Sequence, residues 1–260
     1  MSLNNEKSIQ LYQAIAESNE DRVFKLWHAS SMSMCPRAHY FKRMAVPSLS
    51  KPTGAKVIRW GAGHHLETAI RPHIEAVYGK TASNDRMTSE KLSLTGEFDN
   101  LVVSDSRLVE IKSVSDFAFI QRNGITSLKE ATGGINKWGK ADYKAKDTPY
   151  LGHEIQNHAY VLLLKEKGIA VKNIDYVYIS LSGRIVVYST EVQPTIMRNV
   201  KARLEALNQA WETKTPPPCI CTPEHPLYDS VMQWCDYKEE GRCCSLELLN
   251  KEKQDDTTTN

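Results

Sequence analysis

The segment from Gly96 to Asp116, GEFDNLVVSDSRLVEIKSVSD, restricts the fold more than any other part of this 260-residue chain. Its alternating apolar residues and polar centre predict two antiparallel strands joined by a turn. The first strand nevertheless carries Asp99, and the second carries Glu110 and Lys112. Charges inside apolar strands cost free energy unless they are satisfied, so this hairpin must either expose the three side chains or use them.

Side-chain parity predicts that the three charges share one face of the hairpin. Glu110 and Lys112 are two residues apart on one strand and therefore point the same way. An even turn centred on residues 104–105 places Asp99 opposite Glu110. The same turn shifted by one residue places Asp99 opposite Lys112, still on that face. An odd turn would put Asp99 on the other face.

Two carboxylates and an ammonium on one face suit divalent-metal chemistry. Neighbouring carboxylates repel each other, and the pKa of one rises unless a cation lies between them. Mg²⁺ is commonly bound by one or two carboxylates together with water and phosphate, and a nearby lysine can orient an attacking water. The pattern therefore indicates metal-assisted phosphodiester hydrolysis. The competing interpretation is a solvated strand face with a cross-strand ion pair.

The spacing of these residues resembles the PD-(D/E)XK nuclease superfamily. Asp99 is followed, after ten residues, by Glu110-Ile111-Lys112, and Phe98 stands where the name of the motif has proline.

Signatures on both sides of the hairpin extend the resemblance to the RecB-like, CRISPR-associated and phage exonuclease branch. Gly63 and Glu67, on a predicted helix before the hairpin, are similar to its Gly-x-x-x-His/Glu signature, and His64 shares a helical face with Glu67. Gln156 and Tyr160, one turn apart on a helix after the hairpin, are similar to its Gln-x-x-x-Tyr signature. The order of the three motifs along the chain is that of the family.

The resemblance implies a restriction-endonuclease-like α/β core and metal-dependent hydrolysis of DNA, as an exonuclease acting on single strands or duplex ends. It implies a Mg²⁺ or Mn²⁺ site formed by Glu67, His64, Asp99, Glu110 and the Ile111 carbonyl. Lys112 would position or activate water, and Gln156 and Tyr160 would steady Lys112 or the scissile strand. Two alternatives stay open: a metal-stapled nucleic-acid-binding protein that does not cut, and a restriction-type endonuclease.

The order of the predicted elements indicates a central mixed sheet flanked by helices. Helices are predicted over 5–30, 55–79, 149–168 and 191–213, and strands over 86–113 and in a hairpin around Ser182 and Gly183. The expected organisation is an N-terminal helical extension over 1–30, a nuclease core over 31–215, a cysteine-bearing segment over 216–249 and a disordered tail over 250–260.

Five of the six cysteines follow residue 218, and Cys35 stands apart from them. In a reducing compartment such a cluster more often binds metal than forms disulfides. CPRAHYF, beginning at Cys35, resembles an element of family members that hold an iron–sulfur cluster. That resemblance implies a four-iron, four-sulfur cluster on Cys35, Cys221, Cys235 and Cys244.

Lys238 departs from this cysteine pattern, because the family has a ligand at the corresponding position. Cys219 and Cys243 are therefore alternatives to Cys221 as the fourth ligand. Zinc is an alternative to the cluster, since four thiolates suit both. The cysteines would otherwise pack as small apolar residues.

Candidate nucleic-acid contacts are the basic residues Arg37, Lys137, Lys140 and Lys144. The three lysines lie in a stretch that also carries Trp138 and Tyr143, and lysines interleaved with aromatic rings suit phosphates and stacked bases. A solvated basic loop is the competing interpretation.

The overall charge and hydropathy restrict the setting only broadly. A formal net charge of +2 argues neither for nor against nucleic acid. No apolar run approaches the length of a transmembrane helix, and the N-terminus lacks the apolar core of a signal peptide. We therefore expect a protein without membrane contact in the cytoplasm, which is the host cytoplasm if the chain is viral. Phage recombination, DNA repair and CRISPR adaptation all stay open.

Overall fold

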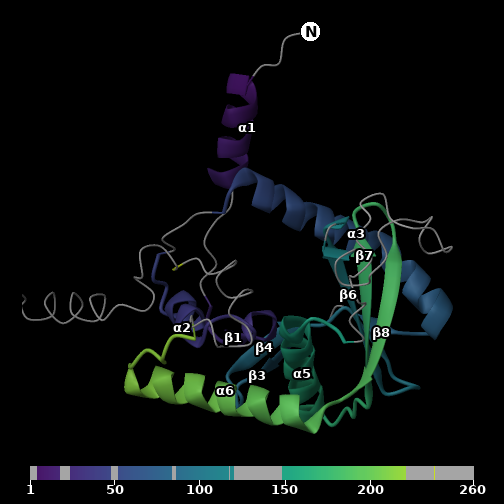
Figure 1. The fold of residues 1–260 in the computed structure, drawn as a ribbon. Coiled ribbons are helices and arrows are strands. Elements are labelled where there is room, and N and C mark those ends of the chain that lie inside the picture. Colours follow the sequence, from purple (N-terminus) through teal and green to yellow (C-terminus); the bar gives the residue numbers. More distant parts are fainter. Residues whose placement is uncertain are drawn as a thin grey trace, which may run out of the picture.

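The computed structural model describes residues 5–17, 24–47, 52–83, 86–116, 118–119, 148–220 and 237 (Figure 1). Its helices are α1 (Asn5–Glu17), the short 3-10 helix η1 (Ala29–Ser31), α2 (Pro36–Arg43), α3 (Gly54–Tyr78), α5 (Leu151–Glu166) and α6 (Pro194–Thr213). Its strands are β1 (Trp27–His28), β2 (Ala82–Ser83), β3 (Arg86–Ser89), β4 (Leu94–Glu97), β5 (Asn100–Val102), β6 (Arg107–Val114), β7 (Asn173–Ser180) and β8 (Ile185–Glu191). Within these ranges no helix is both long enough and apolar enough to cross a membrane.

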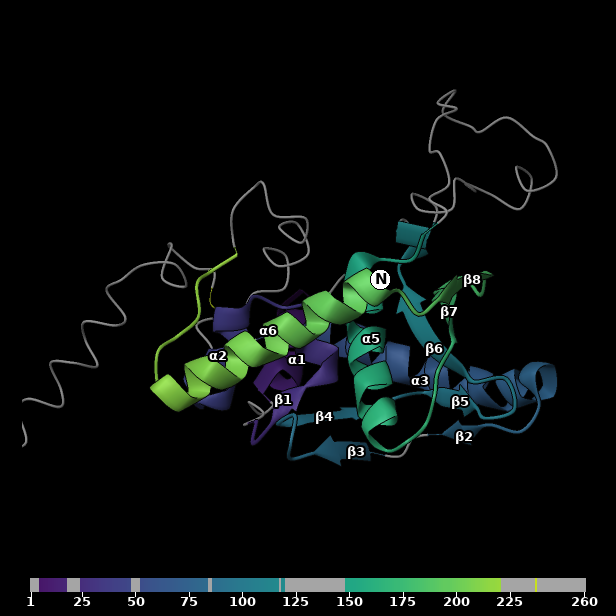
Figure 2. The same ribbon diagram turned by 90° about the horizontal axis from the view of Figure 1, so that it is seen from below.

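The strands form two sheets among the described residues. The larger has the order β2-β5-β6-β7-β8, and the smaller has the order β1-β4-β3. β6 and β7 run parallel, whereas the other neighbours in the larger sheet are antiparallel. Helices pack against these sheets, with α5 and α6 crossing in front of them (Figure 2). The predicted mixed sheet flanked by helices is therefore confirmed.

The β5–β6 pairing confirms the predicted hairpin and its even turn. The last pair joins Val102 to Arg107, so the turn spans residues 103–106 and is two residues longer than the shortest possible turn. The same register, continued one residue beyond the first pair, places Asp99 opposite Glu110.

Both faces of the central strands are covered. One face packs against Ile74 of α3 through Val109, Ile111, Val177 and Ile179. The opposite face joins the main core through Leu108, Ile174, Tyr176 and Tyr178. α5 lies over this second face and is buried without interruption from Glu154 to Leu164, because α6 and the smaller sheet cover its outer side. A helix enclosed in this way can hold polar side chains against the sheet and away from bulk water.

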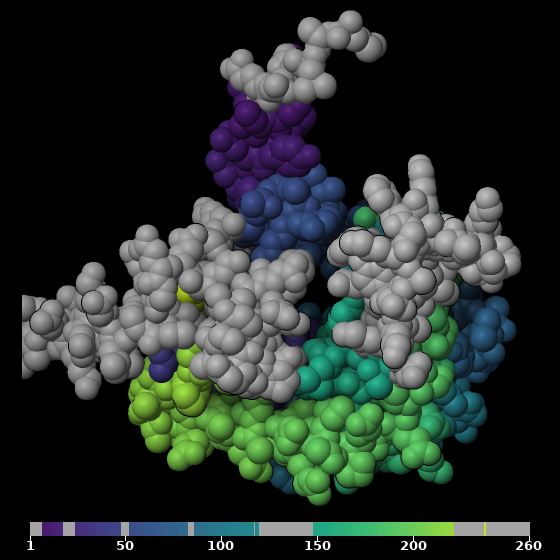
Figure 3. Space-filling view, in the orientation of Figure 1, coloured from purple at the N-terminus to yellow at the C-terminus, as the bar shows by residue number. Residues whose placement is uncertain are grey.

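The predicted helix over residues 5–30 is confirmed over Asn5–Glu17 and is wrong at Trp27 and His28. Trp27 and His28 instead form β1, which pairs in parallel with β4. Trp27 is completely buried, and its Nε1 donates a hydrogen bond to Asn208 of α6 at 2.6 Å. These residues therefore pack into the core and do not extend a helix. α1 itself stands out from the body and meets it near the start of α3 (Figure 3).

α3 carries a stripe of apolar residues that is only partly buried, formed by Ile58, Leu66, Ile70, Ile74 and Val77. Ile74 is 5% exposed, whereas Ile58 and Val77 are 47% and 78% exposed. α3 has 25 residues and is longer than the strands beneath it, so part of the stripe finds no partner among the described residues. The hairpin predicted around Ser182 and Gly183 is confirmed as β7–β8. The predicted cysteine segment and tail lie outside the described residues, apart from 216–220 and Tyr237.

Asp175 fastens α3 to the start of β6 across the sheet. It is 3% exposed and accepts hydrogen bonds from Arg107 Nη1 at 2.5 Å and from the Tyr78 hydroxyl at 2.8 Å. Burial and the bond to Asp175 raise the pKa of Tyr78 to about 12, so the phenol remains a donor at neutral pH.

We expect Asp175→Ala to lower the free energy of unfolding by about 2 kcal/mol or more, because two donors lose a charged acceptor. Urea denaturation measures this change. The control is Glu97→Ala, which breaks an exposed ion pair with Arg86 (3.6 Å) and should cost about 0–1 kcal/mol. Equal effects of the two variants would contradict the fastening role.

Candidate active site

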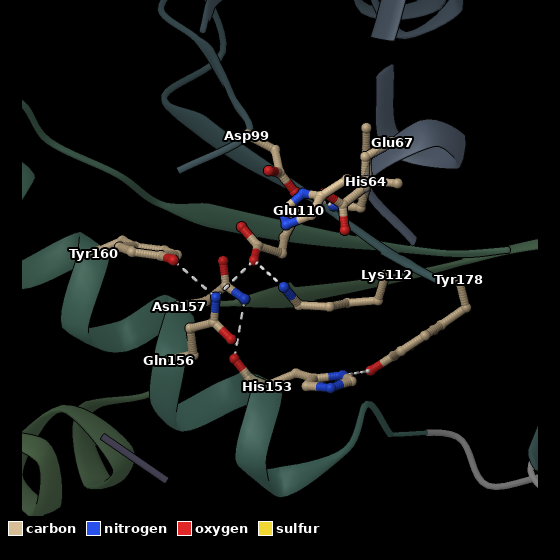
Figure 4. A network of polar contacts seen from close by, with 11 residues as sticks. His64, Glu67, Asp99, Glu110, Lys112, His153, Gln156, Asn157, Tyr160 and Tyr178 are labelled. Atoms are coloured by element: carbon tan, nitrogen blue, oxygen red, sulfur yellow. Dashed lines mark hydrogen bonds and ion pairs between the residues drawn. The ribbon is translucent and has the colours of Figure 1, made fainter. Parts of the chain in front are cut away.

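Side chains from α3, the β5–β6 hairpin and α5 meet at one place (Figure 4). The residues gathered there are Glu67, Asp99, Glu110, Lys112, Gln156 and Tyr160. The structure thus brings together residues that the three sequence motifs placed 93 positions apart, from 67 to 160.

Glu110 is the centre of the polar network. Its side chain is 2% exposed. Oε1 accepts hydrogen bonds from Lys112 Nζ at 2.5 Å and from Gln156 Nε2 at 2.9 Å. Gln156 Nε2 also donates to the Tyr160 hydroxyl at 2.8 Å. Oε2, by contrast, is buried and has no hydrogen-bond partner among the described residues.

Asp99 is held across the hairpin by a backbone group. Its Oδ2 accepts from the Ile111 N–H at 2.7 Å, which fixes the carboxylate beside Glu110. This contact uses the amide of Ile111, whereas the sequence assigned a metal-binding role to its carbonyl.

Glu67 reaches the site from α3. His64 Nδ1 lies 3.4 Å from Glu67 Oε2, and the side chains of His64 and Glu67 are 82% and 21% exposed. Glu67 is therefore turned into the site, while His64 lies at its open edge.

The carboxylates carry more negative charge than Lys112 neutralises. Burial raises the pKa of Glu110 to about 8; Asp99 adds to the rise and Lys112 opposes it. Burial acts to lower the pKa of Lys112, but Glu110 and Asp99 reverse this and hold it above its ordinary value. Burial and then Asp99 also raise the pKa of Glu67. The raised pKa of Lys112 means that it keeps its proton at neutral pH.

The donors present fit a hydrated divalent cation. Among the described residues no three His, Cys, Asp or Glu side chains are close enough to form a complete metal cage. Mg²⁺, however, is usually held by one or two carboxylates and keeps several waters, so it needs no such cage. The unsatisfied Oε2 of Glu110, next to the crowded charge of Asp99, is the kind of hard oxygen that Mg²⁺ or Mn²⁺ takes.

Two glycines permit the close approach of these elements. A Cβ on Gly96 would lie 2.7 Å from Cε1 of Tyr160 and 2.9 Å from Cβ of Ala29. A Cβ on Gly63 of α3 would lie 2.7 Å from Oγ of Ser113 on β6. The sequence motif already contained Gly63. Gly96 was missed as a site residue, and its only signal was a glycine inside a predicted strand.

Three further polar residues near the site were not assigned a role from the sequence. His153 Nδ1 lies 2.9 Å from the hydroxyl of Tyr178, which pairs with Lys112 in the β6–β7 register. Asn157 follows Gln156 and is completely buried. No sequence signal distinguished Asn157, which stands between Gln156 and His158 before the apolar run of α5.

The expected iron–sulfur site is not supported. Cys221, Cys235 and Cys244 lie outside the described residues. Cys35 Sγ lies 3.8 Å from Sγ of Cys219, which was an alternative to Cys221 as the fourth ligand. Two sulfurs do not make a four-ligand site, and within the described ranges no third metal-binding side chain joins them.

The predicted nucleic-acid contacts are mostly untested. Lys137, Lys140 and Lys144 lie outside the described residues. The Nε of Arg37 donates to the carbonyl of Pro217 at 2.8 Å, so this side chain braces the segment after α6.

Solved structures share this fold. An alkaline exonuclease from Laribacter hongkongensis superposes with a TM-score of 0.50 at 14% identity, over 79% of this chain and 93% of that one. The same exonuclease in complex with dAMP gives a TM-score of 0.49 at 13% identity, over 79% and 93% of the two chains. A phage-related exonuclease from Haemophilus somnus 129PT gives 0.41 at 16% identity, over 77% and 97%. No family model and no curated protein sequence matches the chain.

We expect Gly96→Ala to destabilise the protein by about 1–3 kcal/mol and to displace the Tyr160 ring, because the added methyl overlaps a packed aromatic side chain. Thermal or urea unfolding measures the loss. Gly61→Ala is the matched control: its Cβ meets nothing within 4 Å, so alanine should stabilise α3 by up to about 1 kcal/mol. A Gly96→Ala variant more stable than the unmodified protein would show that the Tyr160 ring is not held in place next to residue 96.

Proposed function

We propose that this chain is a divalent-metal-dependent deoxyribonuclease that degrades DNA from ends. The observation that carries the proposal is the buried Glu110 carboxylate. Lys112 and Gln156 hold one of its oxygens, and the other is left without a partner beside Asp99. A structural ion pair would need no unsatisfied oxygen in the core, and leaving one there costs free energy.

Glu110 and Asp99 are the residues that would hold Mg²⁺ or Mn²⁺, with Glu67 alongside. When bound, such an ion supplies charge stabilisation for the phosphate and lowers the pKa of a coordinated water. His64, at the exposed edge of α3, would adjust the charge of Glu67 through their ion pair.

Lys112 acts as a cation and hydrogen-bond donor, because its Nζ donates to Glu110 and keeps its proton. It is 20% exposed, so the ammonium can also reach a phosphate oxygen or an attacking water at the open side. Gln156 holds the Glu110 oxygen from α5, and the Tyr160 hydroxyl accepts a second hydrogen bond from Gln156 and so steadies it. These three side chains position the reacting groups and stabilise developing negative charge.

DNA ends are the proposed substrate on two grounds. The fold is shared with an alkaline exonuclease at a TM-score of 0.50. The order of the Glu67, hairpin and Gln156 motifs also resembles the exonuclease branch of the superfamily.

We expect Glu110→Gln and Lys112→Ala each to lower Mn²⁺-supported digestion of labelled linear DNA by about 100-fold or more, because each removes a charge at the reacting phosphate. Asp105→Asn is the control, since Asp105 is 60% exposed in the turn of the same hairpin. Its activity should equal that of the unmodified protein. Equal digestion by all four proteins would indicate a contaminating nuclease and remove the proposal.

A comparison of linear with covalently closed circular duplex DNA separates the remaining possibilities. An exonuclease degrades the linear form and leaves the circle intact. Cutting of the circle would indicate a restriction-type endonuclease. Retarded migration of either DNA without any cleavage, in Mg²⁺ and in Mn²⁺, would indicate a binding protein.

A further inference from the structure

Asn157 holds a polar group in a place where apolar side chains prevail. It is completely buried on α5. Its Nδ2 donates to the His153 carbonyl at 3.0 Å. Because a carbonyl can only accept, this bond fixes which end of the amide is nitrogen. Oδ1 must therefore point the other way, and it has no hydrogen-bond partner among the described residues.

The unsatisfied oxygen of Asn157 belongs to the same region as that of Glu110. Asn157 adjoins Gln156, whose Nε2 donates to Glu110 Oε1. Figure 4 shows the Asn157 amide next to the Glu110 carboxylate, between α5 and β6. Both Oδ1 of Asn157 and Oε2 of Glu110 are buried acceptors without partners in the described part of the chain. When Glu110 is ionised, as it is when it holds a metal ion, these two acceptors cannot satisfy each other, so the ionised site calls for a donor or a cation.

We propose that Asn157 is a positioning residue for the metal, whose Oδ1 accepts a hydrogen bond from a water in the hydration shell of the ion held by Glu110. This inference rests on the proposed function. A bound Mg²⁺ keeps several of its waters, and those waters are strong donors that need acceptors on the protein. An amide oxygen serves this purpose without adding a further negative charge to a site that already holds three carboxylates.

The test is calorimetric titration of Mn²⁺ into the full-length protein without DNA. We expect Asn157→Leu, which keeps the approximate size but removes the oxygen, to weaken Mn²⁺ binding about tenfold. We expect Asn157→Asp to strengthen binding, because a carboxylate is a better acceptor for metal-bound water. The rise in melting temperature that Mn²⁺ induces should be smaller in Asn157→Leu and larger in Asn157→Asp than in the unmodified protein. This rise can be measured even where a variant is less stable than the unmodified protein.

Two controls separate a metal-directed role from a structural one. Asn208→Leu removes an amide on α6 that accepts from Trp27, and it should lower stability without changing Mn²⁺ affinity. Tyr176→Phe removes a buried hydroxyl on the strand next to Glu110, and it should also leave the affinity unchanged. If Tyr176→Phe weakened Mn²⁺ binding as much as Asn157→Leu, both groups would be sharing a structural water and the inference would be wrong.

Failure of this inference differs from failure of the proposed function. Unchanged Mn²⁺ affinity in both Asn157 variants, with tight binding to the unmodified protein that Glu110→Gln abolishes, would overturn the role of Asn157 alone. Absence of Mn²⁺ binding to the unmodified protein, with or without DNA, would overturn both.

Discussion

A carboxylate buried between a sheet and a helix organises this protein. Glu110 lies under α5 with one oxygen shared by Lys112 and Gln156. Placing a charge there is expensive unless donors surround it. Because both donors come from fixed positions, one on the same strand and one on α5, the helix and the sheet have to meet in one register. The enclosed packing of α5 meets this requirement: a helix covered on all sides cannot rotate its polar face away from Glu110.

The close approach of the remaining elements follows from this arrangement. β4 needs a glycine at position 96 to make room for Tyr160 and Ala29, whereas Gly63 lets α3 approach the Ser113 hydroxyl of β6 closely. Neither glycine has the positive φ that favours glycine elsewhere, so neighbouring side chains account for both. Asp175 stabilises the fold at the C-terminal end of α3, away from the reacting groups. There it accepts hydrogen bonds from Tyr78 and Arg107. Stability and proposed chemistry are thus carried by different polar networks, which share only α3 and β6.

The sequence pattern predicted contacts correctly where the contacting residues lie close together in the sequence. Parity along β5 and β6 predicted that Asp99 and Glu110 share a face, and the observed pairing has that register. Helical spacing placed Gln156 and Tyr160 together, and the two side chains are hydrogen-bonded. Pattern failed at Trp27 and His28, whose strand exists only because β4 lies beside it. It also left the cysteine nearest to Cys35 undecided, since the contact with Cys219 spans 184 residues and depends on where α6 ends.

The sequence by itself determined the mixed sheet, the helices on its faces and the set of charged residues that α3, the hairpin and α5 present. These follow from residue periodicity, which acts over a few positions and is written directly in the chain. Tertiary structure decided which oxygen of Glu110 is used, why Gly96 must lack a side chain, and that Asn157 has a buried oxygen without a partner among the described residues. Such features depend on distances between elements brought together by packing, and no spacing along the chain encodes them.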